Sequence, residues 1–139
     1  MRRRRAERGQ ALVEFAIGAI TFMILVLGVF DVGRAVWNYN TLAGATREGT
    51  RYAMVHGSAS SSPSGPAAND ASVRAAVAKY ASGLNSANLT TTSTWLDGSN
   101  AAGSRVKVTT TYKFSSIFSS LFHIAPFAMT SSSTMTITN

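Results

Sequence analysis

An uninterrupted apolar segment near the N-terminus constrains the fold of this chain more than any other feature. The 20 residues from Ala11 to Phe30 contain a single charged side chain, Glu14. As an α-helix this segment is about 30 Å long, which matches the hydrocarbon thickness of a bilayer. A helix of this length in a soluble protein would show a polar face, and this segment lacks one. The sequence therefore predicts a transmembrane helix over residues 11–30.

The charges that flank the segment predict its orientation. Residues 1–9 contain five Arg and one Glu, so they carry +4 of the net charge of +7. Basic residues stay on the cytoplasmic side of a membrane helix, which places the N-terminus in the cytoplasm and residues 31–139 outside. A secretory signal peptide cut near Gly33 and Ala35 is the alternative. Its apolar core would normally span only about 7–15 residues, which favours the uncut membrane helix.

Gly9 separates this basic leader from the apolar helix, so a cut after Gly9 would remove the leader and keep the helix. Glu14 would then stand at the fifth position. A carboxylate within a bilayer costs roughly 2.5 kcal/mol or more unless it is paired or near an interface. Two explanations are open: Glu14 reaches the headgroups near the helix N-terminus, whose field favours an anion, or it pairs with a positive group of a neighbouring subunit. The new α-amine at Gln10 would be such a group.

The segment ERGQALVEFAI (residues 7–17) resembles the start of TadE-like proteins, the minor pseudopilins of the Tad (Flp) pilus system, and is similar to the leader junction of type IV pilins. The resemblance covers roughly residues 7–55. It implies that a prepilin-type peptidase cuts between Gly9 and Gln10, and that Glu14 neutralises the Gln10 amine of a neighbour during pilus assembly or secretion. Gln10 stands where classical pilins carry an N-methylated Phe.

The partners that the resemblance implies are the bacterial inner membrane, the peptidase and other pseudopilins or pilus assembly proteins. The small residues Gly18, Ala19 and Gly28 would allow the cut helices to pack closely. The alternative function is an uncleaved, signal-anchored extracytoplasmic domain that acts as a binding or scaffold protein. Retention of residues 1–9 in the mature protein would favour it.

The helical period continues past the membrane, so residues 10–55 are expected to form one rod with an amphipathic extension. This extension has a stripe expected to pack on the outer domain, consisting of Val32, Ala35, Val36, Tyr39, Leu42, Ala43, Thr46 and Ala53. Residues 57–69 are rich in Ser, Gly and Pro and read as a flexible linker. Asp70 is expected to cap a helix that runs to about Ser82, with Gly83 as its stop.

Residues 70–139 are predicted to form an extracytoplasmic α/β domain. Alternation from Val106 to Phe114 indicates a half-buried strand, and 89–96 and 127–137 indicate two more, with one face of the sheet covered by hydroxyl groups. The fold class is α+β and pilin-like, with a second helix and three or four antiparallel strands. An apolar stretch from Ile117 to Phe127 is expected to form a short helix that plugs the core; a subunit contact or a patch on the membrane surface is the alternative.

Nothing in the sequence indicates an active site. The chain has no cysteine, and its two histidines, His56 and His123, have no acidic cluster around them. Asp70 and Asp97 are expected to serve a helix cap and a turn. We therefore expect a non-enzymatic protein without metal, cofactor or small-molecule substrate. Since the residues outside the leader carry only +3, nucleic-acid binding is not expected either.

Overall fold

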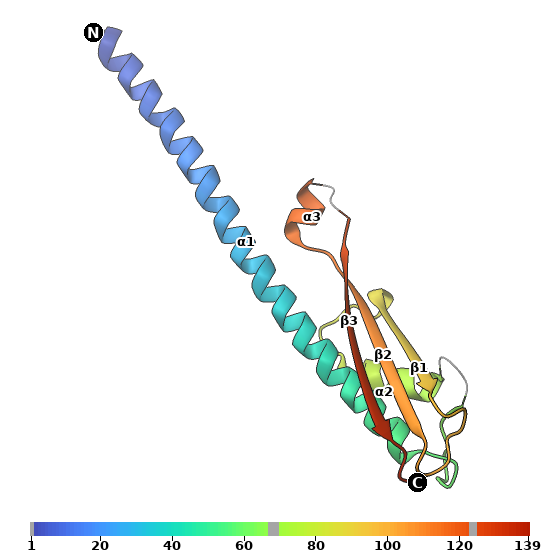
Figure 1. The fold of residues 1–139 in the computed structure, drawn as a ribbon. Helices are drawn as coiled ribbons and strands as arrows, with labels where there is room; N and C mark the ends of the chain where they lie inside the picture. Colours follow the sequence, from blue (N-terminus) through green and yellow to red (C-terminus); the bar gives the residue numbers. More distant parts are fainter. Residues whose placement is uncertain (1, 67–69, 123–124) are drawn as a thin grey trace.

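The computed structural model describes residues 2–66, 70–122 and 125–139. Its dominant element is α1 (Arg2–Val55), a single helix of 54 residues and about 81 Å. The N-terminal half of α1 projects away from the rest of the chain, while its C-terminal half packs on a small domain (Figure 1). The helix thus begins at Arg2 rather than after Gly9, and the leader residues described by the structure continue it.

The projecting half of α1 has the properties of a membrane anchor. Its side chains from Gly9 to Leu25 are exposed on every side of the helix. Within the part of the chain that the structure describes, α1 is the one helix long and apolar enough to cross a membrane. Exposed apolar side chains around a whole helix suit hydrocarbon and not water, so the geometry fits a single-pass anchor.

The domain contains a three-stranded antiparallel sheet in the order β1-β2-β3. Its strands are β1 (Leu89–Trp95), β2 (Arg105–Phe114) and β3 (Phe127–Thr136), with a 3-10 turn, η1 (Ser86–Asn88), before β1. The register pairs Thr91 with Thr110 and Tyr112 with Met129. These strands agree with the predicted ranges to within a few residues, and the α+β, pilin-like fold class is confirmed.

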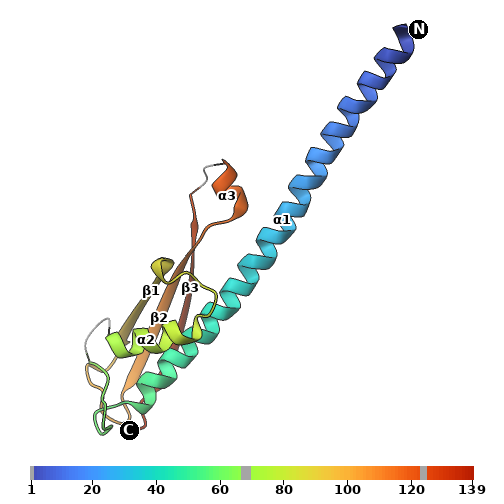
Figure 2. The ribbon, with the colours of Figure 1, turned by 180° about the vertical axis from the view of Figure 1, so that it is seen from behind.

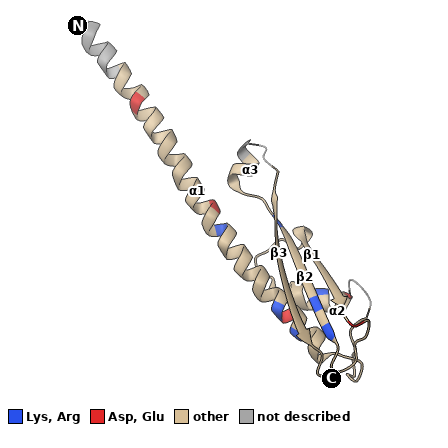
Figure 3. Cartoon of the chain, in the orientation of Figure 1, with Lys and Arg blue, Asp and Glu red and all other residues tan. Residues whose placement is uncertain are grey.

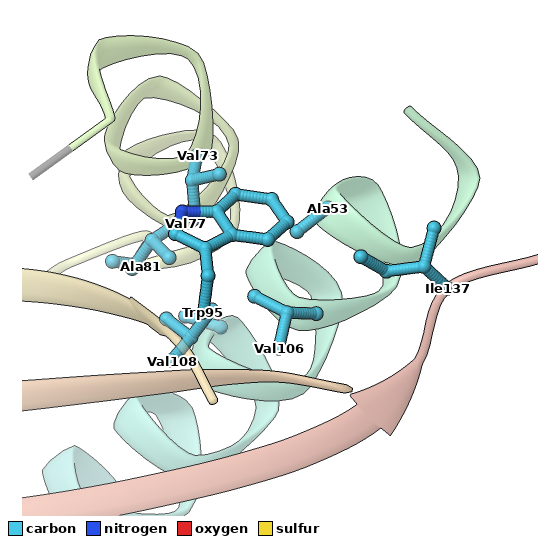
Figure 4. Close-up of a cluster of buried hydrophobic side chains, with 9 residues drawn as sticks. Ala53, Val73, Val77, Ala81, Trp95, Val106, Val108 and Ile137 are labelled. Carbon is cyan, nitrogen blue, oxygen red and sulfur yellow. The ribbon is translucent and has the colours of Figure 1, made fainter. Parts of the chain in front are cut away.

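One face of the sheet forms the core. The C-terminal half of α1 and the helix α2 (Ala71–Tyr80) lie against this face (Figures 1 and 2). Trp95 of β1 points into the cluster between sheet and helices (Figure 4). The buried members of this cluster are Ala45, Ala53, Val73, Val77, Ala81, Trp95, Val106, Val108 and Ile137. The opposite face of the sheet carries many Ser and Thr side chains, as predicted, together with Arg105, Lys107 and Lys113 of β2.

The predicted helix cap and turn carboxylates are confirmed. Asp70 accepts hydrogen bonds from the backbone N–H groups of Ser72 and Val73 at the start of α2. Partial burial raises its pKa, but hydrogen bonds from the Ser72 hydroxyl and from backbone N–H groups outweigh this effect, so the pKa lies below its ordinary value. Asp97 accepts a side-chain hydrogen bond from Arg105 at 2.8 Å. This bond and one from the Arg105 backbone N–H lower the pKa of Asp97.

The face of α1 that enters the core differs from the predicted stripe. Leu42, Thr46 and Ala53 are buried as expected, but Val32, Val36 and Tyr39 are exposed. The buried face includes Asn38 and Thr50 instead. Short polar residues can line the packed face of a helix when close approach of the backbone matters more than hydropathy. A pattern of apolar residues therefore predicts the wrong face of α1 as the buried one. The expectation that Val32, Val36 and Tyr39 pack on the domain is therefore wrong.

The segment predicted as a flexible linker is held against the domain over residues 57–66. The Ser64 backbone N–H donates to the His56 carbonyl at 2.8 Å, and the Asn100 side-chain amide donates to the Ser64 carbonyl at 3.0 Å. Ser64 is buried, and Gly65 approaches the Trp95 ring closely. Small residues here serve close packing, which composition alone does not distinguish from flexibility. Residues 67–69 of the predicted linker lie outside the described residues.

The apolar stretch after β2 does form a short helix, α3 (Ile117–Phe122), but it does not plug the core. Instead α3 lies beyond the end of the sheet, beside α1 (Figures 1 and 2). The core is already filled by Trp95 and by side chains of α1 and α2, so it has no room for a further apolar helix. Ile124, which the sequence analysis included in this stretch, lies outside the described residues.

Candidate processing and assembly site

The predicted processing junction lies on an exposed part of α1. Gly9, Gln10, Val13, Glu14 and Ile17 border one shallow groove along the helix. Gln10 and Glu14 are one turn apart and lie on the same side of α1, whereas Gly9 lies about 140° around the helix from Glu14.

Whether the field of the helix N-terminus stabilises the Glu14 carboxylate depends on whether the leader has been cut off. In the uncut chain α1 begins at Arg2, so Glu14 lies about three turns inside the helix. The favourable field of a helix N-terminus fades within the first turn, so it does not stabilise Glu14 in this form. Removal of residues 1–9 would place Glu14 in the first or second turn, where that field acts.

The three small residues predicted to mediate helix packing differ in their surroundings. A Cβ added to Gly18 would have no atom within 4 Å, and Ala19 is exposed. Gly28 faces α3 of the same chain, because a Cβ placed there would lie 3.8 Å from a ring carbon of Phe118. Gly28 thus lies in van der Waals contact range of α3 within the same chain, a neighbour that the sequence did not predict.

An exposed apolar stripe runs along α1 from the membrane segment to the outer part of the helix. We define the outer stripe as Leu25, Val29, Val32, Val36 and Tyr39, which follow one another at spacings of three and four. Their exposed fractions range from 48% to 73%. At about 100° per residue, Glu14 and Gly18 fall on the same side of the helix as this stripe, roughly a quarter turn from the buried face.

Asp31 has a structural role that the sequence did not predict. Residues 9–30 contain one charged side chain, Glu14, and Asp31 directly follows the predicted span. Figure 3 shows how sparse charge is along this described part of α1. Asp31 is only 7% exposed. Its two oxygens accept the backbone N–H groups of Ile117 and Phe118 at 2.9 and 3.0 Å. Its pairing partner lies 86 residues away, so no local pattern could have revealed this contact.

Arg34 completes the group around Asp31. Its guanidinium nitrogen Nη1 lies 3.5 Å from Asp31 Oδ1. Its guanidinium carbon lies 5.5 Å from the centre of the Phe114 ring. The side chain is about half exposed, so it links the end of β2 to α1 and still presents a positive charge to the surroundings.

The described residues contain no group of three or more His, Cys, Asp or Glu side chains that could hold a metal ion. His56 stacks on Tyr52 with ring centroids 3.9 Å apart, and its Nδ1 lies 2.8 Å from the Tyr52 carbonyl oxygen. This histidine therefore takes part in local packing at the end of α1. His123 lies outside the described residues.

An open groove of about 570 Å³ lies between α1 and α2. Its charged side chains interact with their neighbours: Arg51 lies 3.5 Å from Glu48, and Lys79 lies 5.9 Å from the centre of the Tyr80 ring. The groove contains no arrangement of a nucleophile and a base that would indicate catalysis.

Comparison with known proteins supports the resemblance found in the sequence. Residues 9–51 match the family model described as TadE-like protein. No curated protein and no solved structure matches the chain. The matched segment begins at Gly9 and includes Glu14, the outer stripe and the Asp31 contact, and it lies entirely within α1. Residues 9–51 of α1 are thus similar to TadE-like proteins, a family associated with Tad pilus systems and with the membrane.

Proposed function

We propose that this chain is a single-pass minor pseudopilin that acts in assembly of a Tad (Flp) pilus or a related secretion filament. Its N-terminus lies in the cytoplasm, and its α/β domain lies outside the inner membrane. The observation that carries the proposal is the outer stripe, which continues the apolar surface of the membrane segment beyond residue 30. A simple anchor needs apolar residues only within the bilayer.

The outer half of the stripe needs a partner in water. Val32, Val36 and Tyr39 leave apolar surface exposed just beyond the predicted span. Burial of a Val or Leu side chain stabilises an assembly by roughly 1.5–3 kcal/mol. A parallel helix of a neighbouring subunit would cover this surface along its length, as in other helix pairs with contacts at spacings of three and four.

Processing would prepare the helix for this contact. Hydrolysis of the Gly9–Gln10 peptide bond by a prepilin-type peptidase adds water across the amide, which leaves a carboxylate on Gly9 and an α-amine on Gln10. The basic leader, residues 1–9, would be released on the cytoplasmic side of the membrane. Glu14 lies on the side of the outer stripe, so a neighbour packed there would bring its own Gln10 amine close. A charge buried in low dielectric is costly when unpaired, so the pair would fix the axial register of the helices.

The first experiment is the N-terminal sequence and intact mass of the protein purified from its native membrane. A chain that starts at Gln10 would support processing. A chain that starts at Met1 would contradict it and favour an uncleaved anchored binding or scaffold protein. A start near Val36 would show a secreted domain and exclude any role for Glu14.

The second experiment tests the stripe by cross-linking. Because the chain has no cysteine, Val36→Cys introduces a single thiol on the stripe, and Ser132→Cys introduces one on the exposed face of the sheet. In cells that assemble the filament, oxidation should give disulfide-linked species through position 36 and not through position 132. Equal cross-linking at both positions would contradict the proposed contact.

Glu14 is tested in the same cells. Glu14→Ala should leave membrane insertion unchanged and block incorporation into sheared filaments. Glu14→Asp, which keeps the charge, should restore part of the incorporation. Normal incorporation of Glu14→Ala would refute the pairing with Gln10.

A further inference from the structure

The contact between Asp31 and α3 fixes the height of α3 along α1. The first backbone N–H groups of a helix have no acceptor within the helix. Asp31 accepts two of them, from Ile117 and Phe118. Asp31 immediately follows the predicted membrane span 11–30. Helix α3 is therefore held level with the point where α1 leaves the bilayer.

A second contact places α3 against the span itself. Gly28 is two residues before the end of the span, and a Cβ on it would lie 3.8 Å from Phe118 Cε2. This distance is an ordinary van der Waals contact, so the Phe118 ring lies directly against α1 at this position. Both contacts place the tip of the domain beside the last turn of the membrane segment, as Figures 1 and 2 show from opposite sides.

The tip presents exposed apolar side chains and no Lys, Arg, Asp or Glu at this level. Residues 114–128 contain none of these four residue types, although four of them are Ser. Ile117 and Phe127 are 38% and 51% exposed, although each is a large apolar side chain. Phe30 of α1, at the end of the span, is exposed as well. Positive charge lies just outside, because the half-exposed Arg34 is one turn further along α1.

We propose that the tip formed by α3 and by residues 125–127 inserts into the interfacial region of the membrane leaflet that faces the domain. The proposal rests on α1 crossing the membrane, which also underlies the proposed function, but it adds a second membrane contact. Exposed apolar side chains at the depth of the headgroups are a means by which peripheral segments bind lipid. The half-exposed Arg34, which is paired with Asp31, lies at the edge of this surface. Lipid, rather than a protein partner, is favoured because the surface is continuous with that of the membrane span.

The second contact would restrict the orientation of the domain on the membrane. A single helix allows the attached domain to tilt and rotate about the helix axis. Two membrane contacts, at the span and at the tip, would fix the tilt of the domain and its rotation about the axis of α1. The outer stripe would then stay accessible to a neighbouring subunit. Before assembly, each subunit would then present its stripe in a defined direction.

The experiment measures the depth of spin labels in the full chain. Single cysteines replace Ile117 or Phe127 at the tip, Ile20 in the middle of the span, and Ser132 on the exposed face of the sheet. Each labelled protein is reconstituted in vesicles of phosphatidylethanolamine and phosphatidylglycerol. Collision with oxygen, which concentrates in lipid, is compared with collision with a nickel chelate, which stays in water.

We expect the ratio of oxygen to nickel collision to be highest at position 20, intermediate at 117 and 127, and several-fold lower at 132. Lipid-like values at 20 with water-like values at 117 and 127 would overturn the proposal and leave the anchor intact. Water-like values at all four positions would overturn both. Spectral broadening at 127 that disappears on dilution with unlabelled protein would show a second copy over the tip, which also overturns the proposal.

A second variant tests the role of Asp31 as a positioning residue. Asp31→Ala removes the acceptor for the first backbone N–H groups of α3. Asp31 is not a member of the main core cluster, so the domain should still fold. The label at position 117 should become more mobile and lose part of its oxygen accessibility, while the label at position 20 should be unchanged. An unchanged label at 117 would contradict the idea that Asp31 sets the height of α3.

Discussion

A single methyl group at Gly49 should weaken the contact between α1 and α2. A Cβ built on Gly49 would lie 2.2 Å from Val77 Cγ2, which is far inside van der Waals contact. Val77 is fully buried and β-branched, so its side chain cannot rotate away without a new clash. Overpacking of this kind costs about 1–3 kcal/mol. Since Ala is favoured over Gly in a helix by about 1 kcal/mol, we expect a net loss of roughly 1 kcal/mol for Gly49→Ala, with about 2 kcal/mol as the upper end.

Gly44 provides a matched control within the same helix. A Cβ added at Gly44 would have no atom within 4 Å, and the position is exposed. Gly44→Ala should therefore stabilise the protein by up to about 1 kcal/mol through helix propensity alone. The assay is urea unfolding of the full chain in detergent micelles, followed by the fluorescence of Trp95, which packs in the same cluster as Val77. The midpoints of the two variants should shift in opposite directions at constant slope.

A double variant tests whether the clash is the cause. Val77→Ala removes a buried side chain and should destabilise on its own, whereas combined with Gly49→Ala it makes room for the new methyl group. The cost of the double variant should therefore be clearly less than the sum of the single costs. Simple addition, or a stabilising effect of Gly49→Ala like that of Gly44→Ala, would refute this description of the contact.

Three further predictions concern the domain and use the same unfolding assay. Gly65→Ala should destabilise more than Gly98→Ala, because both glycines have positive φ (73° and 68°) but only Gly65 lies against the Trp95 ring; equal losses would contradict this. Asp70→Ala should cost about 1 kcal/mol through loss of the cap of α2, and an unchanged midpoint would contradict the cap. Because the folded-state pKa values of Asp70 and Asp97 are lowered, their contribution to stability is full above the ordinary Asp pKa of about 3.9 and is lost as pH falls through the folded values. Stability measured from pH 6 to pH 2 should fall in this acid range, and by less in Asp70→Asn.

Features that depend on local sequence could be predicted. The alternation from Val106 to Phe114 defined β2 because its even-numbered side chains enter the core, and the Asp70 cap followed from its place before an apolar-periodic run. A membrane segment was predicted because these 20 residues with one charge lack the polar face of a soluble helix of that length. The opening motif around Gly9 indicated a resemblance to TadE-like proteins, whose family model matches residues 9–51.

Features that depend on long-range packing could not be predicted. Asp31 meets Ile117 and Phe118 only in the folded chain, so its role as the acceptor for α3 has no local signature. The position of α3 was predicted wrongly because the apolar content of a segment indicates that it leaves water, but does not indicate which surface covers it. Likewise, the Ser-rich segment around Ser64 packs on the domain through contacts with Asn100, 36 residues further along the chain.

The error in the predicted stripe of α1 is itself informative about function. The face that enters the core is built largely from short residues: Thr46 and Thr50 are fully buried, and their hydroxyls donate to carbonyls of the preceding turn at 2.7 Å. These groups are satisfied within the helix, so they allow close approach without needing a partner from the sheet. The larger side chains of Val32 and Val36 lie roughly a quarter turn away from this face and are exposed. A helix that packed only on its own domain would be expected to place its large apolar residues inward. Their outward position, on the side of Glu14 and of the membrane surface, is consistent with a helix that carries its own domain on one face and meets a neighbouring subunit on another.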